Sequence, residues 1–368
     1  MKNKKTGNKL KIEWPKILLK LSLTTLILAI FLTIFFANDG VNIFKDTLYV
    51  SDFYGNDFQL HCIDVGQGDS FLIRLPNDKT MLIDCGEQDS GNKVKSYINQ
   101  YFAKEKLSKI DYFVLTHPDS DHIGGGDVIV DNFEIENLFR PKYYSLYEEE
   151  NLSNLKSYKV SDSQTYDYII SKAYQKNISI YFSEKGLTID ENGFKIEFLS
   201  PKKDVYSNSN DYSAVIMITC HGKRALFMGD ASTNIETTLL SDYGNDLKAD
   251  ILKIGHHGSK TSTSQEFLQA VNPSHAIISV DKNNSYSLPD VNVLKNLYSS
   301  NVIISSTAEL GNFAMTIEND EVVIAKQGQL PIDIALLISA TILSILILWA
   351  IPMNFKWLEI NKSNKKQK

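Results

Sequence analysis

Residues 115–125 have the sequence LTHPDSDHIGG, which is the part of the chain that best predicts the fold. Four potential metal ligands, His117, Asp119, Asp121 and His122, fall within six residues. The almost unbroken apolar run before them, residues 110–117, is typical of a strand that is buried on both faces. A glycine-rich turn follows, and loops at strand ends project polar side chains from a rigid scaffold. The segment therefore predicts a cation site at the end of a buried strand.

Three other motifs place acids or histidines where predicted strands end. They are DVGQGD at 64–69, MGD at 228–230 and GHHGS at 255–259. Imidazole and carboxylate together suit zinc, manganese or iron, and two ions about 3.5–4 Å apart share bridging ligands in many hydrolases. The histidines argue against a calcium loop, which uses oxygen ligands only. Each motif taken alone has another interpretation. Its Asp and Gly residues are typical of ordinary turns, and its histidines are typical of surface residues or of buried residues with hydrogen-bond partners.

The remaining pattern predicts an α/β domain with two groups of strands, each accompanied by helices. Residues 141–192 differ, with repeated Tyr, Glu, Ser and Lys, and we interpret them as a cap or insertion over the site. Short branched runs separated by turn residues predict the strands, and amphipathic spacing predicts the helices. We expect strands at 58–66, 69–75, 80–86, 110–117, 194–201, 212–220, 224–230, 249–259, 275–281 and 301–306, two closing strands before 325, and helices at 92–106, 263–270 and 290–299.

The ordered set DVGQGDS, LIDCG, LTHPDSDHIGG, FMGD and LKIGHHGS resembles metallo-β-lactamase-fold hydrolases. It is similar in particular to the extracellular hydrolase domain of the competence protein family ComEC. The resemblance covers residues 58–310, and its motifs recur in the family's order. It implies a four-layer αββα sandwich, with the metals held at one edge between the two sheets.

The same resemblance implies roles for individual residues. His117 and Asp119 would hold a first ion, Asp121 and His122 a second, and Asp230 would bridge the two. Which of the two imidazoles of the GHHGS motif ligates stays open; our assignment takes His257 as the ligand and makes His256 catalytic, with Asp121 and Asp230. Asp64 and Asp69 would support the site, and the substrate-binding candidates are Asp211, Ser259 and Tyr286.

The chain departs from the family's pattern at three places. Asp119 stands where most of the superfamily has histidine. The usual third histidine is replaced by the stretch 208–211, which puts the first ion in doubt. Leu288 replaces the histidine of an N-x-Y-x-H-P motif at 284–289, which puts proton delivery in doubt.

Both ends of the chain predict membrane spans. About 20 apolar residues cross a bilayer as a helix, and residues 17–37 and 332–352 have that character. A cleaved signal peptide is the alternative for the first, although its apolar run is longer than the usual 7–15 residues. Lysine-rich flanks stay cytoplasmic, so both ends face the cytoplasm and the domain lies outside the bacterial plasma membrane. The predicted segments are two basic tails (1–16 and 353–368), the two spans, a tether (38–57) and the domain (58–327).

Charge limits the partners. Residues 38–331 carry 26 Lys+Arg against 41 Asp+Glu, a net charge of −15. Such a surface repels phosphate backbones, so we expect no non-specific DNA binding, although cleavage of nucleic acid at a metal centre stays open. The odd count of three cysteines, without C-x-x-C spacing, favours buried small apolar residues over a Cys62–Cys85 disulfide.

Two functions follow from these observations. The first is a hydrolase with one or two divalent ions, zinc or manganese, because such an ion lowers the pKa of bound water toward about 7. Its substrate would be a phosphodiester, either extracellular nucleic acid or a phosphate-bearing polymer of the cell envelope. The alternative is a catalytically weak or inactive metal-binding scaffold protein of the envelope, which the departures at 208–211 and Leu288 favour.

Overall fold

Two large β-sheets face each other in the computed structural model, which describes residues 57–151, 158–161 and 163–326. The first sheet has the strand order β17-β16-β1-β2-β3-β4-β5-β8, and the second has β15-β14-β13-β12-β11-β10-β9. The first contains β17 (Glu321–Lys326), β16 (Phe313–Glu318), β1 (Gln59–Cys62), β2 (Phe71–Leu75), β3 (Lys79–Ile83), β4 (Lys109–Val114), β5 (Glu134–Arg140) and β8 (Ser179–Phe182). The second contains β15 (Ile303–Ser306), β14 (His275–Ile278), β13 (Ile251–Lys253), β12 (Lys223–Phe227), β11 (Val215–Cys220), β10 (Phe194–Ser200) and β9 (Thr188–Glu191).

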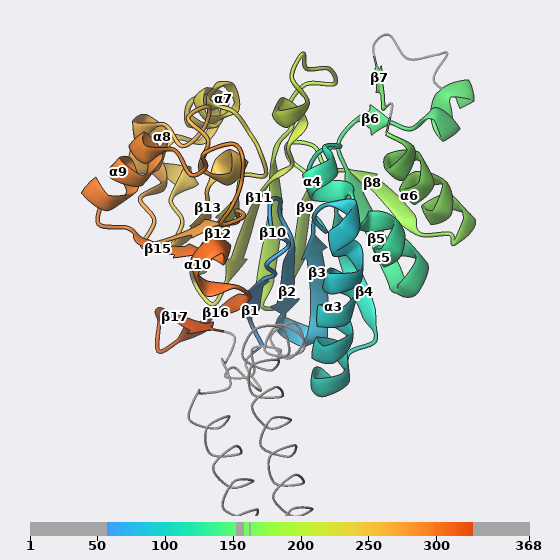
Figure 1. The fold of residues 1–368 in the computed structure, drawn as a ribbon, viewed down its shortest axis with the longest axis horizontal. Helices are drawn as coiled ribbons and strands as arrows, with labels where there is room; N and C mark the ends of the chain where they lie inside the picture. Colours follow the sequence, from blue (N-terminus) through green and yellow to red (C-terminus); the bar gives the residue numbers. More distant parts are fainter. Residues whose placement is uncertain (1–56, 152–157, 162, 327–368) are drawn as a thin grey trace, which may run out of the picture. The chain divides into compact units, whose positions relative to one another are not determined.

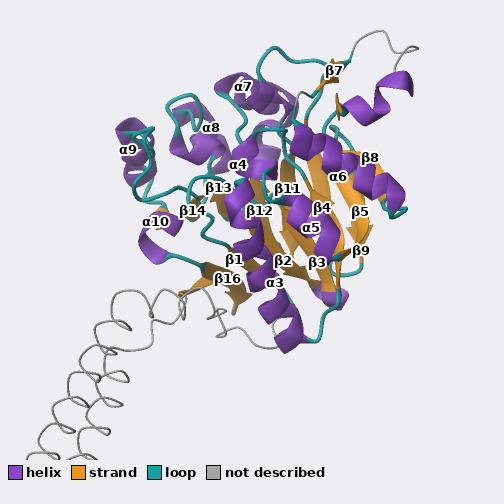
Figure 2. Cartoon of the chain, turned by 45° about the vertical axis from the view of Figure 1, so that its right-hand side comes forward, coloured by secondary structure: helices purple, strands orange, loops and turns teal. Residues whose placement is uncertain are grey.

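Helices cover the outer face of each sheet, as Figures 1 and 2 show. On the outer face of each sheet, the apolar residues of the sheet and of its helices form a buried cluster. A third cluster fills the space between the two sheets. The chain therefore forms the four-layer αββα sandwich that the family resemblance implied. The first sheet is covered by α3 (Gly91–Glu105), α5 (Gly126–Asn132) and α6 (Gln164–Gln175), and the second by α7 (Thr233–Tyr243), α8 (Gln265–Val271) and α9 (Val291–Ser299).

Strand β3 shows why the inner strands read as continuous apolar runs. Met81 and Ile83 point into the cluster between the sheets, whereas Leu82 points into the cluster under the helices. All three are at most 1% exposed. A strand with apolar layers on both faces needs apolar residues at every position, so its sequence loses the alternation of a half-exposed strand.

The predicted cap at 141–192 is divided by the structure. Helix α6 and strand β8 lie inside this segment, and both belong to the layers of the sandwich. Ile169 and Ile170, on the inner side of α6, are fully buried in the cluster between this helix and the first sheet. What stands apart from the two large sheets is the small pair β6 (Tyr143–Tyr144) and β7 (Lys159–Val160), with the short helix η4 (Leu146–Asn151). Only this smaller segment remains as a candidate cap.

The predicted membrane spans lie towards the two ends of the chain, and the structure describes residues between them. No helix among them combines the length and the apolar character that crossing a membrane requires. The predicted spans at 17–37 and 332–352, the two tails and the tether up to residue 56 lie outside the described residues. The three cysteines are buried and free, so the Cys62–Cys85 disulfide is not formed.

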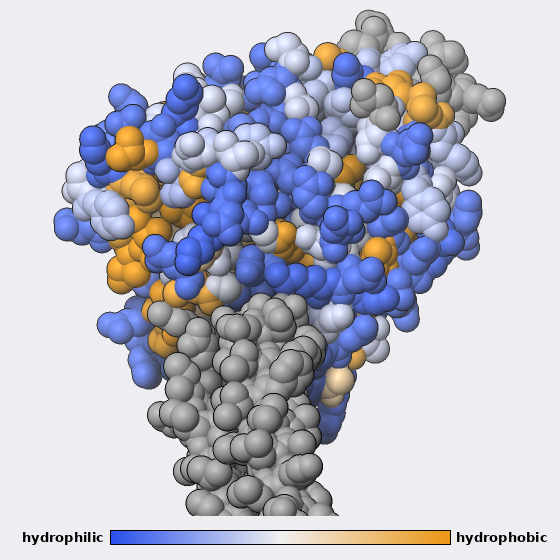
Figure 3. Space-filling model, viewed as in Figure 1, coloured by the Kyte–Doolittle hydropathy of each residue, from blue (hydrophilic) through white to orange (hydrophobic). Residues whose placement is uncertain are grey.

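The face of the molecule shown in Figure 3 is largely hydrophilic. Hydrophobic residues gather on it around α9 and β15, where Val291 and Ile303 are 58% and 54% exposed.

Candidate metal centre

Four loops bring acids and histidines to one edge of the sandwich. Strands β3, β4 and β5 run parallel in the first sheet, and β12, β13 and β14 run parallel in the second. The loops after β3, β4, β12 and β13 therefore leave from the carboxyl ends of these strands. They carry, respectively, Asp84, the segment 117–122, Asp230 and the pair at 256–257.

Asp121, His122, Asp230 and His257 form one compact group. Each offers a ligand atom, and the four atoms lie within 4.8 Å of one another. His122 Nε2 lies 3.2 Å from Asp230 Oδ1, and His257 Nε2 lies 3.2 Å from Asp121 Oδ2. Asp121 keeps 24% of its side chain exposed, whereas the side chains of the other three are almost fully buried. Three distant stretches of the sequence thus meet at a point that solvent reaches from one side.

The polar atoms of this centre fit a divalent cation. Within the described part of the chain, the buried atoms His117 Nε2, His122 Nε2, His257 Nε2 and Asp230 Oδ1 make no hydrogen bond. Buried polar atoms without a partner are rare in native proteins, because each costs its desolvation free energy. Three imidazole nitrogens and a carboxylate oxygen that converge in this way are suited to one or two divalent metal ions.

Asp84 orients His122, and the sequence analysis missed this role. The Asp84 carboxylate accepts hydrogen bonds from the Thr116 backbone N–H at 2.8 Å, from Thr116 Oγ1 at 2.6 Å and from His122 Nδ1 at 2.7 Å. With its proton on Nδ1, His122 presents the Nε2 lone pair to the centre. The sequence contains one signal for this role, because Asp84 is an acid near the end of the predicted strand 80–86, in the motif LIDCG.

The same logic applies to the other two buried imidazoles. His257 Nδ1 donates to the carbonyl oxygen of Ser279 at 2.8 Å. His117 Nδ1 lies 3.0 Å from Thr116 Oγ1, whose own hydrogen is donated to Asp84, so the hydroxyl oxygen accepts from His117. All three rings are therefore held with the Nε2 lone pair free.

Asp69, which the sequence analysis expected to support the site, lies beside His257. Its Oδ1 is 3.4 Å from His257 Nδ1, and its Oδ2 forms an ion pair with Lys253 at 2.7 Å. Lys253 is only 1% exposed, so this is a buried ion pair. Asp64 lies elsewhere: it accepts from the Gly66 N–H at 3.1 Å and belongs to no ligand-type cluster among the described residues.

The loop that carries Asp69 packs tightly on the loop that carries Asp121. Asp69 N donates to the Asp121 carbonyl at 3.1 Å. Gly68 has φ +125°, and a Cβ atom there would lie 2.1 Å from the same carbonyl oxygen. Only glycine fits both this backbone conformation and this close approach.

The site predicted for the first ion has fewer converging ligand atoms than the group of four described above. His117 Nε2 lies 3.6 Å from Asp119 Oδ2, and Asp119 also accepts from Ser209 Oγ at 3.2 Å. The stretch 208–211 thus does reach the centre, through Ser209 and Asn210. Asp211, predicted to bind substrate, is 6% exposed and accepts instead from Ser232 Oγ at 2.5 Å.

The remaining candidates lie at the rim. His256 keeps 30% of its side chain exposed, and its Nε2 lies 3.7 Å from Asp230 Oδ2. Ser259 Oγ contacts Thr261 Oγ1 at 2.9 Å, and Tyr286 is 71% exposed on the loop after β14. Leu288 packs against the apolar cluster beneath α8 and α9.

The charges of the centre shift the pKa values of its own groups. Burial opposes protonation of His122, but Asp230, Asp121 and Asp84 raise its pKa well above the usual value. Burial likewise opposes protonation of His257, yet Asp230 and Asp121 raise its pKa. Burial would raise the pKa of Asp230, but His257 and His122 hold it well below the usual value. A cation must therefore displace protons from the imidazoles when it binds.

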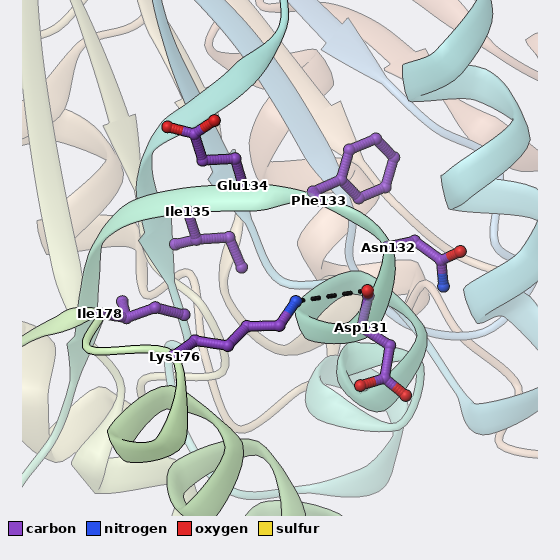
Figure 4. Close-up of a pocket in the computed structure, with 7 residues that line it drawn as sticks. All are labelled: Asp131, Asn132, Phe133, Glu134, Ile135, Lys176 and Ile178. Carbon is purple, nitrogen blue, oxygen red and sulfur yellow. Dashed lines mark hydrogen bonds between the residues drawn. The ribbon is translucent and has the colours of Figure 1, made fainter.

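A separate pocket of about 380 Å³ lies away from this chemistry (Figure 4). Its walls include Glu134 and Ile135 at the start of β5, and Lys176, which donates to the Asp131 carbonyl at 3.3 Å. In the parallel pair β4–β5, Lys109 lies opposite Glu134 and Val114 opposite Phe139. The loop that carries His117 and His122 follows Val114, at the carboxyl end of β4. The pocket therefore lies at the opposite, amino-terminal ends of these strands.

Comparison with known proteins decides the family. Residues 63–281 match the family model described as the metallo-beta-lactamase superfamily. The chain belongs to this superfamily. Its members are generally metal-dependent hydrolases, which agrees with the convergence of histidines and acids described above.

Two curated relatives confirm the resemblance to the ComEC family. The chain is 27% identical to ComE operon protein 3 of Bacillus subtilis (strain 168) over 74% of its length and 34% of that protein. It is 28% identical to Recombination protein 2 of Haemophilus influenzae over 72% of its length and 29% of that protein. The chain thus spans about a third of the length of these relatives.

Among solved structures, CmlA, a diiron β-hydroxylase from Streptomyces venezuelae, is similar with a TM-score of 0.45 and 13% identity. The match covers 68% of this chain and 52% of that one.

Proposed function

We propose that this protein is a membrane-anchored, metal-dependent phosphodiesterase that acts on the outer side of a bacterial plasma membrane. The observation that carries the proposal is the set of buried ligand atoms without hydrogen-bond partners, on His117, His122, His257 and Asp230. A bound zinc or manganese ion would supply hydroxide at neutral pH. The competence-related relatives favour a phosphodiester, in nucleic acid or in an envelope polymer.

The residues around the metal centre would have different roles. Asp121, His122, Asp230 and His257 would hold an ion, Asp84 would fix the orientation of His122, and the Ser279 carbonyl would fix that of His257. His256, at the solvent side of Asp230, would donate a hydrogen bond to the oxygen of the leaving group. Asp121 and Asp230 would also orient the attacking water through their second oxygens.

The test is metal content together with activity of the purified full-length chain. We expect bound transition metal by elemental analysis and hydrolysis of bis-p-nitrophenyl phosphate with added manganese. His122→Ala should abolish both. His221→Ala is a matched control, because His221 is exposed and pairs with Asp57 at 2.7 Å. A chain without metal and without hydrolysis would leave the scaffold interpretation standing, and full turnover by His122→Ala would refute the ligand assignment.

The membrane location rests on the two apolar segments and their lysine-rich flanks. Protease added to intact cells should degrade the domain, because the predicted topology exposes it outside. Survival of the domain in intact cells, with degradation after lysis, would place it on the cytoplasmic side instead.

A further inference from the structure

One of the four histidines at the centre is held differently from the other three. His117, His122 and His257 each place Nδ1 against an acceptor: a hydroxyl, a carboxylate and a backbone carbonyl, respectively. An imidazole with its proton on Nδ1 keeps the Nε2 lone pair for a metal ion. These three rings are therefore oriented as ligands.

At the same position, His256 faces an amide nitrogen and a hydroxyl group. Its Nδ1 lies 3.3 Å from Asn210 Nδ2 and 3.1 Å from Thr261 Oγ1. An amide nitrogen can only donate, so His256 Nδ1 accepts and the proton sits on Nε2. On the other side of the amide, Asn210 Oδ1 lies 3.4 Å from Ser209 Oγ, whose single hydrogen it shares with Asp119 Oδ2.

The Nε2–H of His256 is directed at the centre from its solvent side. The nitrogen lies 3.7 Å from Asp230 Oδ2, and the ring remains 30% exposed. A nitrogen that carries a proton in the neutral ring has no lone pair for a metal ion. It can instead donate to an oxygen of a substrate that enters from solvent.

We infer that Asn210 keeps His256 out of the metal's ligand set and makes it a hydrogen-bond donor to the substrate. One ion is then held tightly by the complete group of four, and a second ion is held weakly by His117, Asp119 and the shared Asp230. This inference rests on the proposed function and names a positioning residue for the same site. It accounts for an asparagine in the stretch where the family's pattern has a third histidine.

The reaction step that depends on Asn210 is the departure of the leaving group. The His256 Nε2–H donates a hydrogen bond to the leaving oxygen as its bond to phosphorus breaks; the electron pair of that bond stays on the oxygen, and the proton stays on the neutral imidazole. The effect is largest for leaving groups of high pKa, because the negative charge that develops on their oxygen accepts the strongest hydrogen bond.

The decisive variant is Asn210→Asp. A carboxylate at this position would accept from His256 Nδ1–H, as Asp84 does from His122, and would free the Nε2 lone pair for the second ion. The matched control is Asn208→Asp. Asn208 is exposed, and its Oδ1 accepts from the Asn210 N–H at 3.3 Å, a contact that aspartate keeps. The control thus adds the same charge two residues away and makes no contact with His256.

The first readout is calorimetric titration of the metal-free, full-length chain with manganese. We expect one tight ion and a second that binds at least tenfold more weakly. In Asn210→Asp the second ion should bind at least tenfold more tightly than in the wild type, and in Asn208→Asp less than threefold more tightly. Asn210→Ala, which removes the donor without adding charge, should tighten the second ion in the same direction and serves if the aspartate variant fails to fold.

The second readout compares two aryl phosphodiesters at saturating manganese. In Asn210→Asp, kcat for a phenyl leaving group should fall at least tenfold more than kcat for 4-nitrophenyl, with KM changed little. Two ions of equal affinity in the wild type, or a second ion unaffected by both Asn210 variants, would overturn the inference and leave the proposed function intact. A wild-type chain that binds no manganese or zinc would overturn the proposed function itself.

Discussion

Asp84→Asn tests whether the orientation of His122 controls metal binding. The carboxylate accepts three hydrogen bonds: Oδ1 from the Thr116 N–H at 2.8 Å, and Oδ2 from Thr116 Oγ1 at 2.6 Å and His122 Nδ1 at 2.7 Å. If the amide nitrogen of the variant replaces Oδ2, His122 Nδ1 must accept, and its Nε2 loses the lone pair. If it replaces Oδ1, it meets the Thr116 N–H, and two buried donors face each other.

Either orientation weakens the centre. Loss of the group that orients a ligating histidine typically costs 10- to 100-fold in metal affinity, or about 1.4–2.8 kcal/mol. We expect that loss for the tight ion in Asp84→Asn, measured by manganese titration of the folded chain.

The matched control for this variant is Asp111→Asn. Asp111 is a buried carboxylate near the start of β4, away from the centre, where it accepts from the Thr80 N–H at 2.9 Å and pairs with Lys79 at 2.9 Å. This variant should lose stability and keep its metal affinity. Folded Asp84→Asn that binds manganese within twofold of the wild type would refute the reasoning.

Three further outcomes follow from the structure. Burial lowers the pKa of His61 to about 3, so the folded state stays neutral while the unfolded state takes up a proton below about pH 6.5. Stability should therefore fall as pH drops through this window: between pH 8 and pH 5 the wild type should lose about 2 kcal/mol more than His61→Gln in denaturant unfolding followed by circular dichroism, and equal losses would show that His61 does not titrate in this way. Gly68→Ala would drive a Cβ into the Asp121 carbonyl and should weaken manganese binding at least tenfold; Gly186→Ala, where a Cβ meets nothing within 4 Å, should not, and equal effects would argue against the close packing. Lys253→Met would leave Asp69 buried without its ion-pair partner and should cost about 3–5 kcal/mol of unfolding free energy, and a cost under 1 kcal/mol would mean that the pair contributes little.

The sandwich could be predicted because its inner strands carry an unambiguous pattern. A strand such as β3, with apolar layers on both faces, is an apolar run between turn residues, and that pattern alone marks it. Helices α5 and α7 were not predicted. The apolar positions of α7, Ile235 and Leu239, are separated by threonines, and its start is fixed by Ser232, which caps the Asn234 N–H at 3.2 Å.

The first residues of the centre could also be predicted, because His117, Asp119, Asp121 and His122 lie together in the sequence. Asp69 was expected among the supporting residues, but the roles of Asp84 and of the Ser279 carbonyl were not predicted, because they depend on contacts across long stretches of chain. Strand β5 was missed for a different reason: it is exposed at its start and buried at its end, so its sequence shows no simple alternation.

The division of roles within GHHGS shows where sequence reasoning stops. His256 and His257 are adjacent and chemically identical, yet His257 Nδ1 faces the Ser279 carbonyl and His256 Nδ1 faces the Asn210 amide nitrogen. Both residues have positive φ, 46° and 50°, and this backbone turns the two rings to different sides. Only the three-dimensional structure distinguishes the candidate ligand from the candidate donor.

Anomalous X-ray diffraction from crystals grown with manganese or zinc tests the central claim most directly. The account predicts a metal peak about 2.0–2.3 Å from His122 Nε2, His257 Nε2 and carboxylate oxygens of Asp121 and Asp230. A peak bound by other residues, or none at saturating metal, would contradict the assignment of this edge of the sandwich as a metal centre.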